Sequence, residues 1–201
     1  MSLTKNTALL MISGLMSFMV FAASTDNQST YIDRKPDFKE YATSISQGPF
    51  STQLILDDEQ NSYSAYWKNN MLKELSKPAN FAGHYRLYLQ DRGKGKECQH
   101  GVCGWILDKL SGAVISGLPE YDGSNSYGSV GDNGTPVGKP LEILIYKNSK
   151  LMILTGQAIP FKIENDEYGL PITYPCKAIY YVFENNQFRK IAEDENGCGV
   201  E

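Results

Sequence analysis

The sequence predicts an α+β domain, in which an antiparallel β-meander sheet of hairpins carries one amphipathic N-terminal helix and two disulfides. Three observations predict this fold class. A segment of helical period comes first, three hairpins with short turns follow it, and four cysteines lie among them. Consecutive hairpins pair neighbouring strands, and an amphipathic helix buries its apolar face against the sheet that they form.

The first 24 residues have the pattern of a secretory signal peptide. Lys5 precedes an apolar run from Ala8 to Ala23, whose last residues are small and lead into polar sequence. A retained membrane helix would need roughly 20 apolar residues, and this run is shorter and contains Gly14. We therefore expect cleavage near Ser24 and an exported product, periplasmic or secreted, without a membrane span.

Charge and length limit what the exported chain can be. The formal net charge is −4, and loss of Lys5 by cleavage makes it −5. A mildly acidic chain is a poor candidate for nucleic-acid binding, which depends on neutralising phosphates. Residues 25–47 are polar and predict a loosely held arm. Residues 48–201 have a length that suits a single α+β domain.

The clearest helix is predicted over Ser62–Lys77. Its large apolar residues recur at spacings of three and four, which places them on one face: Tyr63, Tyr66, Trp67, Met71, Leu72 and Leu75. Pro78 ends the helix, because proline disfavours helical geometry in the residue before it. Core packing is the expected role of this aromatic face.

Strands are predicted before and after this helix. Residues 49–56 could form an edge strand, and from Tyr85 to Gln90 apolar and polar residues alternate with the period of a half-buried strand. Three hairpins follow, two of them with turns that contain asparagine, which tolerates the left-handed backbone of tight turns. Their strands are predicted at 103–107 and 113–116, at 141–146 and 151–157, and at 178–184 and 188–192.

A long segment, Gly117–Pro140, fits neither pattern. It is rich in glycine and poor in apolar residues, and loops of this length inside a compact domain are usually functional or disordered. Its aromatic and acidic residues are the candidate binding residues: Glu120, Tyr121, Asp122, Tyr127 and Asp132. Tyrosine offers a large amphipathic contact surface, and the acidic residues would suit a basic partner.

The segment Asn80-Phe81-Ala82-Gly83-His84-Tyr85 follows the helix and its terminal proline. With Cys98, Cys103 and the Asp108-Lys109-Leu110-Ser111-Gly112 turn, it resembles an uncharacterised family of small exported bacterial proteins. That family has an "NFAGHY" strand, two close cysteines and a D-x-x-(S/T)-G turn. The resemblance covers about Ser62 to Ile191 and implies a fold and export, but no activity.

The four cysteines allow three pairings. Pairing within the hairpins, Cys98 with Cys103 and Cys176 with Cys198, fits the predicted strands best. A zinc site at Cys98, His100 and Cys103 lacks a complete ligand set nearby, and exported thiols tend to be oxidised first. We therefore expect two disulfides, no metal and no other cofactor. The second bridge would contribute about 3 kcal/mol in the chain-entropy model.

The candidates for catalysis are His84 and Asp108, and the sequence supports them only weakly. Imidazole titrates near neutrality, so His84 could act as a general base beside the Asp108 carboxylate. The alternative is a histidine hydrogen-bonded at the junction of helix and strand. No nucleophile motif and no phosphate-binding glycine motif accompanies the pair.

The sequence favours a non-enzymatic envelope protein that binds another macromolecule, an inhibitor or immunity-type factor with a protein partner of unknown identity. Its predicted site is the Gly117–Pro140 loop on a disulfide-tied sheet. The alternatives are a hydrolase of envelope material that uses His84 and Asp108, and a structural envelope protein.

Overall fold

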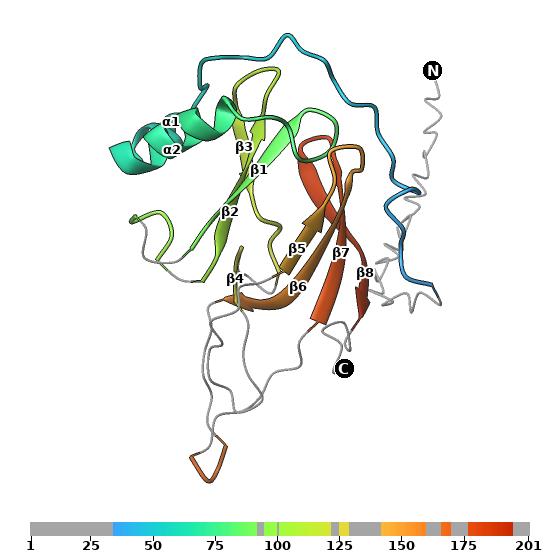
Figure 1. Ribbon diagram of the computed structural model, residues 1–201. Helices are drawn as coiled ribbons and strands as arrows, with labels where there is room; N and C mark the ends of the chain where they lie inside the picture. The colour runs from blue at the N-terminus through green and yellow to red at the C-terminus, as the bar shows by residue number, and fades with distance from the viewer. Residues whose placement is uncertain are drawn as a thin grey trace, which may run out of the picture. The chain divides into compact units, whose positions relative to one another are not determined.

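The computed structural model describes residues 34–91, 95–99, 101–121, 125–128, 142–159, 166–169 and 177–194. Two helices precede the strands (Figure 1). The helices are α1 (Asp58–Asn61) and α2 (Ala65–Leu75). The strands are β1 (Tyr85–Gln90), β2 (Cys103–Asp108), β3 (Val114–Gly117), β4 (Ser126–Gly128), β5 (Glu142–Ile145), β6 (Leu151–Ile159), β7 (Lys177–Glu184) and β8 (Gln187–Asp194).

The strands form two antiparallel sheets. The first has the order β1-β2-β3, and the second has the order β4-β6-β7-β8, with β5 also paired to β6. The predicted antiparallel hairpins are confirmed, but the single continuous sheet is wrong. After β3, the strands β4 and β5 pair with β6 and not with β3. The predicted meander is therefore divided into two sheets.

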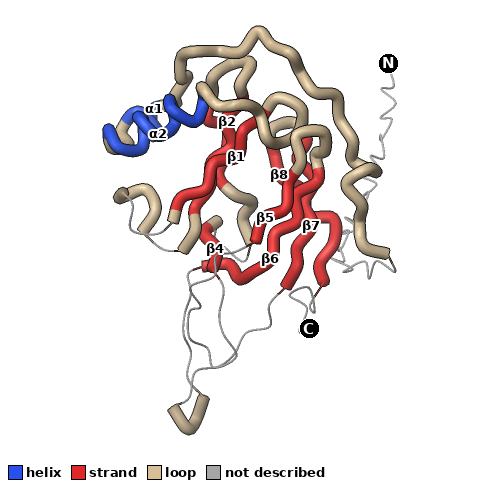
Figure 2. Tube along the Cα trace, in the orientation of Figure 1, coloured by secondary structure: helices blue, strands red, loops and turns tan. Residues whose placement is uncertain are grey.

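The main core lies between the two sheets. Leu87 and Ile106 of the first sheet cluster with Met152, Leu154 and other apolar residues of the second. On the other face of the first sheet, α2 buries Trp67, Met71 and Leu75 against Leu107 and Val114. Both helices lie beside β1–β3, away from β6–β8, as Figure 2 also shows. The predicted packing of a helix on a sheet is therefore confirmed.

The helix is shorter than the predicted Ser62–Lys77. Ser64 caps its N-terminus, where the Ser64 hydroxyl accepts a hydrogen bond from the Trp67 amide at 3.2 Å. Two residues assigned to the buried face, Tyr66 and Leu72, are each 48% exposed. The buried stripe follows Trp67, Met71 and Leu75 at intervals of four, and these two side chains fall outside it.

The N-terminal arm is held more firmly than predicted. In residues 34–47, the Tyr41 carbonyl accepts a hydrogen bond from the Lys150 amide, and the Thr43 amide donates to the Asn148 carbonyl, both at 2.9 Å. Phe38 and Tyr41 pack on the outer face of the second sheet. The arm was predicted to be loosely held because most of its residues are polar, and that prediction did not consider the contacts of Phe38 and Tyr41. The predicted strand at residues 49–56 is reduced to one bridge, between Ile55 and Ala113.

Residues 80–85 form a junction between several parts of the fold, which we call the Gly83 junction. The amide of Gly83 donates to the Lys147 carbonyl at 2.6 Å, and its carbonyl accepts from the Ser46 amide at 3.2 Å. The side chain of Asn80 donates to the carbonyl of Leu87 and accepts from its amide, at 2.9 and 2.8 Å. The junction therefore joins β1, the β5–β6 turn and the N-terminal segment.

Gly83 cannot be replaced without strain. Its φ of +89° lies in the left-handed region, and a Cβ there would come within 2.5 Å of the Ser44 carbonyl oxygen. We expect Gly83→Ala to lower the free energy of unfolding by about 3 kcal/mol or more, from backbone strain and a lost hydrogen bond. Chemical denaturation of the oxidised protein measures this change.

Gly169→Ala is the matched control, because Gly169 has a φ of +77° but nothing within 4 Å of an added Cβ. It should cost only the strain of the backbone, about 1 kcal/mol. Equal losses in the two variants would show that the contacts of the Gly83 junction do not matter.

Candidate functional site

The predicted binding loop contains a strand that joins the two sheets. Residues 117–121 and 125–128 of the loop are described, and β4 lies within them. On one side β4 pairs with β6, with Tyr127 opposite Ala158. On the other side Tyr127 and Val102 exchange both backbone hydrogen bonds, at 2.7 and 3.0 Å. This part of the loop therefore belongs to the framework of the fold.

Tyr127 is a core residue rather than a surface contact. Its side chain is fully buried between the sheets, and its hydroxyl donates to the carbonyl of Pro119. Burial raises the pKa of the Tyr127 phenol. The neighbours of Tyr127 in the sequence are mostly glycine and polar residues, so the sequence did not indicate that Tyr127 is buried. Tyr127 is therefore not available to a partner, contrary to its assignment as a binding residue.

Tyr121 is tied to the ends of β7 and β8. Its hydroxyl donates to Glu193 Oε1 at 3.0 Å, and Lys177 Nζ donates to the same oxygen at 2.6 Å. Lys190 pairs with the other carboxylate oxygen of Glu193 and lies 5.1 Å from the centre of the Tyr121 ring. We call Tyr121, Lys177, Lys190 and Glu193 the Glu193 cluster. It fixes the direction in which the loop leaves the first sheet.

Electrostatics in this cluster favour the charged form of Glu193. Burial opposes ionisation, but hydrogen bonds from Lys177, Lys190 and Tyr121 outweigh it and lower the Glu193 pKa to about 2. The hydrogen bond to Glu193 raises the pKa of Lys177. Sequence reasoning missed these charged residues. Strand alternation could have indicated the pairing of Lys177 with Glu193. It places Lys177 and Ile179 on one face of β7, and Glu193 of β8 lies opposite Ile179.

Of the five candidate binding residues, Glu120 is the one that the structure places on the surface. It is exposed, although Leu118 and Pro119 before it are buried. Tyr121 after it is half-buried in the Glu193 cluster. Asp122 and Asp132 lie outside the described residues. Glu120 is thus an exposed carboxylate held between two anchored neighbours.

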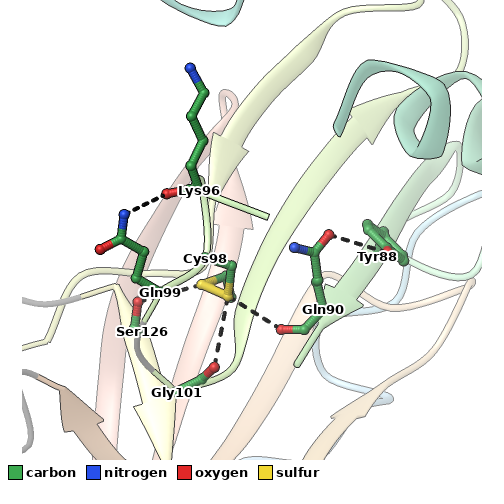
Figure 3. Close-up of a disulfide and its surroundings, with 8 residues drawn as sticks. Tyr88, Gln90, Lys96, Cys98, Gln99, Gly101 and Ser126 are labelled. Carbon is green, nitrogen blue, oxygen red and sulfur yellow. Dashed lines mark hydrogen bonds between the residues drawn. A yellow bond between two sulfur atoms is a disulfide. The ribbon is translucent and has the colours of Figure 1, made fainter. Parts of the chain in front are cut away.

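The predicted disulfide between Cys98 and Cys103 is confirmed (Figure 3). Both cysteines are buried, with Cys98 Sγ 3.5 Å from the Gln90 carbonyl oxygen and Cys103 Sγ 3.7 Å from Ser126 Oγ. Just before Cys98, the carboxylate of Glu97 accepts from the amide and hydroxyl of Ser64, at 2.6 and 2.8 Å. The disulfide loop therefore lies between the start of α2 and β4.

The second predicted bridge lies elsewhere in the chain. Cys176 and Cys198 fall outside the described residues, so their pairing stays a prediction. Within the described part of the chain, no cysteine is free. The same part contains no group of three or more side chains that could hold a metal ion.

The structure brings His84 and Asp108 together. His84 Nε2 lies 3.5 Å from Asp108 Oδ1, and both side chains are partly exposed. The carboxylate of Asp108 also holds its own turn, because it accepts from the Leu110 amide at 2.8 Å and from the Ser111 hydroxyl at 2.7 Å. The imidazole lies against the Tyr85 ring, with 4.0 Å between ring centres.

Within the described residues, no nucleophile accompanies this pair. A nucleophile would need to lie within hydrogen-bond reach of the imidazole. Ser111 contacts Asp108 instead, and no serine, threonine or cysteine of the described segments hydrogen-bonds the His84 side chain. The arrangement is that of a turn-holding carboxylate with a histidine beside it.

Comparisons with known proteins give no relative from which a function could be carried over. No protein-family model, curated protein or solved structure matches this chain. The resemblance of about Ser62 to Ile191 to an exported bacterial family therefore stays a prediction. In the segments that the structure describes, no helix is long and apolar enough to cross a membrane.

The Cys98–Cys103 disulfide should contribute measurably to stability. The chain-entropy model assigns about 2 kcal/mol to a loop of this size. We expect the double variant Cys98→Ser/Cys103→Ser to lose about that much free energy of unfolding, measured by denaturant titration. The oxidised wild-type protein is the reference, and reduction of the wild type should cost more than the double variant, because it would also open the predicted Cys176–Cys198 bridge. A double variant as stable as the oxidised protein would contradict the prediction.

The Glu193 cluster predicts a pH dependence of stability. Because folding lowers the Glu193 pKa from 4.5 to about 2, the ionised carboxylate stabilises the fold above pH 4.5. That contribution, on the order of 2 kcal/mol, should be lost progressively as pH falls toward 2. The difference in unfolding free energy between wild type and Glu193→Gln should therefore shrink over this range. Glu142→Gln, at an exposed position, is the control and should show no such convergence.

Proposed function

We propose that this chain is an exported, non-enzymatic protein that binds another macromolecule, in the manner of an inhibitor or immunity-type factor. The observation that carries the proposal is the anchoring of the segment around Glu120. The Pro119 carbonyl accepts a hydrogen bond from the Tyr127 hydroxyl, and the Tyr121 hydroxyl donates one to Glu193. The exposed Glu120 carboxylate therefore lies between two residues that are held in place.

Anchoring of this kind favours binding. A loop that is ordered before it meets a partner loses less conformational entropy on association than a free one. The neighbours of Glu120 contact β7 and β8 through Tyr121, and the buried Tyr127 joins both sheets. The acidic residue at this position, in a chain of net charge −4, suits a basic surface on the partner.

Export is the second part of the proposal. The signal-peptide pattern of residues 1–24 supports it. The Cys98–Cys103 disulfide is compatible with it, because disulfides persist mainly in oxidising compartments. Both observations agree with a protein of the periplasm or the cell exterior.

A hydrolase of envelope material is the second candidate. The 3.5 Å separation of His84 Nε2 and Asp108 Oδ1 favours it, because a carboxylate can orient an imidazole as a general base. The use of both Asp108 oxygens by the turn weighs against it. Hydrolysis of envelope polymers that disappears in His84→Ala, with the melting temperature preserved, would replace the binding proposal.

The proposal predicts that Glu120 controls partner capture. The oxidised protein, immobilised without its signal segment, should retain one stoichiometric basic protein from envelope and secreted fractions of the producing cells and their competitors. We expect Glu120→Lys to weaken that capture at least about tenfold, through charge reversal at the contact. Binding is measured by surface plasmon resonance with the purified partner.

The control for Glu120→Lys is Glu142→Lys, which reverses an exposed charge on β5. It should leave capture within about twofold of wild type. Variants at Tyr127 are unsuitable, because the residue is buried and its loss would disturb the core. Capture that survives Glu120→Lys unchanged would remove this residue from the proposed site.

A further inference from the structure

A groove lies between α2 and the segment that precedes the helices. It has a volume of about 400 Å³ and is lined by Ser51, Thr52, Asn69, Leu72, Lys73, Leu75 and Ser76. Leu72 is 48% exposed at this groove, although it was expected on the buried face of the helix. A large aliphatic side chain at the wall of an open groove is a suitable contact for an apolar side chain of another molecule.

The surroundings of the groove are cationic. Lys73 lines it and forms no ion pair with a residue in the described segments. Glu74, next to Lys73, is buried. Its carboxylate pairs with Lys77, four residues after Lys73, and with Arg86 of β1. The buried ammonium of Lys109 binds the Leu75 carbonyl at the end of α2.

Lys73, Lys77, Arg86 and Lys109 together with Glu74 carry a net charge of +3. The chain as a whole has a net charge of −4, so the charge of this group of side chains is opposite in sign to that of the chain. A local reversal of this kind selects an acidic partner surface and repels a basic one.

We propose that the groove docks an acidic segment of a partner protein. An apolar side chain of that segment packs on Leu72, and its carboxylates face Lys73 and Lys77. The inference rests on the proposed binding function, but it is independent of Glu120, which belongs to the loop after β3. The two surfaces differ in sign, so separate variants test them.

Two labelled peptides test the proposal by fluorescence anisotropy with the oxidised protein. One is a short fluorescein-labelled peptide of alternating leucine and glutamate, and the other replaces glutamate with lysine. We expect the glutamate peptide to bind at least about fivefold more tightly, against the net charge of the chain. Lys73→Glu and Leu72→Gln should each weaken its binding about fivefold or more.

Matched controls change similar residues away from the groove. Lys39→Glu reverses an exposed charge in the N-terminal arm, and Leu144→Gln alters a leucine of β5 that is 41% exposed. Both should leave binding within about twofold, with all four variants melting near the wild-type temperature. These controls share the residue types of Lys73 and Leu72 but lie outside the groove lining.

Several outcomes would overturn the proposal. They are equal affinity for the two peptides, no binding of the glutamate peptide, and controls as damaging as the groove variants. Binding of dodecanoate without binding of the glutamate peptide would replace it with a site for a small amphipathic anion. If Glu120→Lys leaves partner capture intact while Lys73→Glu weakens the glutamate peptide, only the Glu120 site is lost.

Discussion

The hydrogen bond from the Gly83 amide to the Lys147 carbonyl holds together parts of the chain that are otherwise built separately. The first sheet begins two residues after Gly83, with β1. The acceptor, Lys147, lies in the turn between β5 and β6, and the Ser46 amide of the N-terminal segment donates to the Gly83 carbonyl. The approach is possible because glycine has no Cβ and accepts a φ of +89°. The Ala82 amide, which donates to the Ser149 carbonyl at 3.2 Å, and the Tyr85 hydroxyl, which donates to Asn186 at 2.9 Å, reinforce this link between the two sheets.

The local elements of this fold could be predicted from sequence, because each depends on residues close together in the chain. Helical spacing indicated α2, alternation indicated β1, and the Asn185-Asn186 turn indicated the hairpin of β7 and β8. The division into two sheets could not be predicted in this way. It depends on the choice of β6 as the partner of β4 and β5, a contact between distant segments.

The same distinction applies to the candidate site. The proximity of Cys98 and Cys103, five residues apart, was predictable, and so was the meeting of His84 with Asp108 across paired strands. The burial of Tyr127 and the contact of Tyr121 with Glu193 were not, because the core around Tyr127 is built from both sheets and Glu193 lies far from Tyr121 in the sequence. Residue type alone made both tyrosines look like surface contacts, whereas their surroundings make them anchors.

The side chain of Asn80 has a consequence for assembly. By bonding both polar backbone groups of Leu87, it takes a place on β1 that an additional strand would otherwise occupy. Unlike a strand, an amide side chain offers no new edge beyond itself. The Asn80 side chain therefore blocks β1 at Leu87 and disfavours edge-to-edge pairing with a second copy of the chain there.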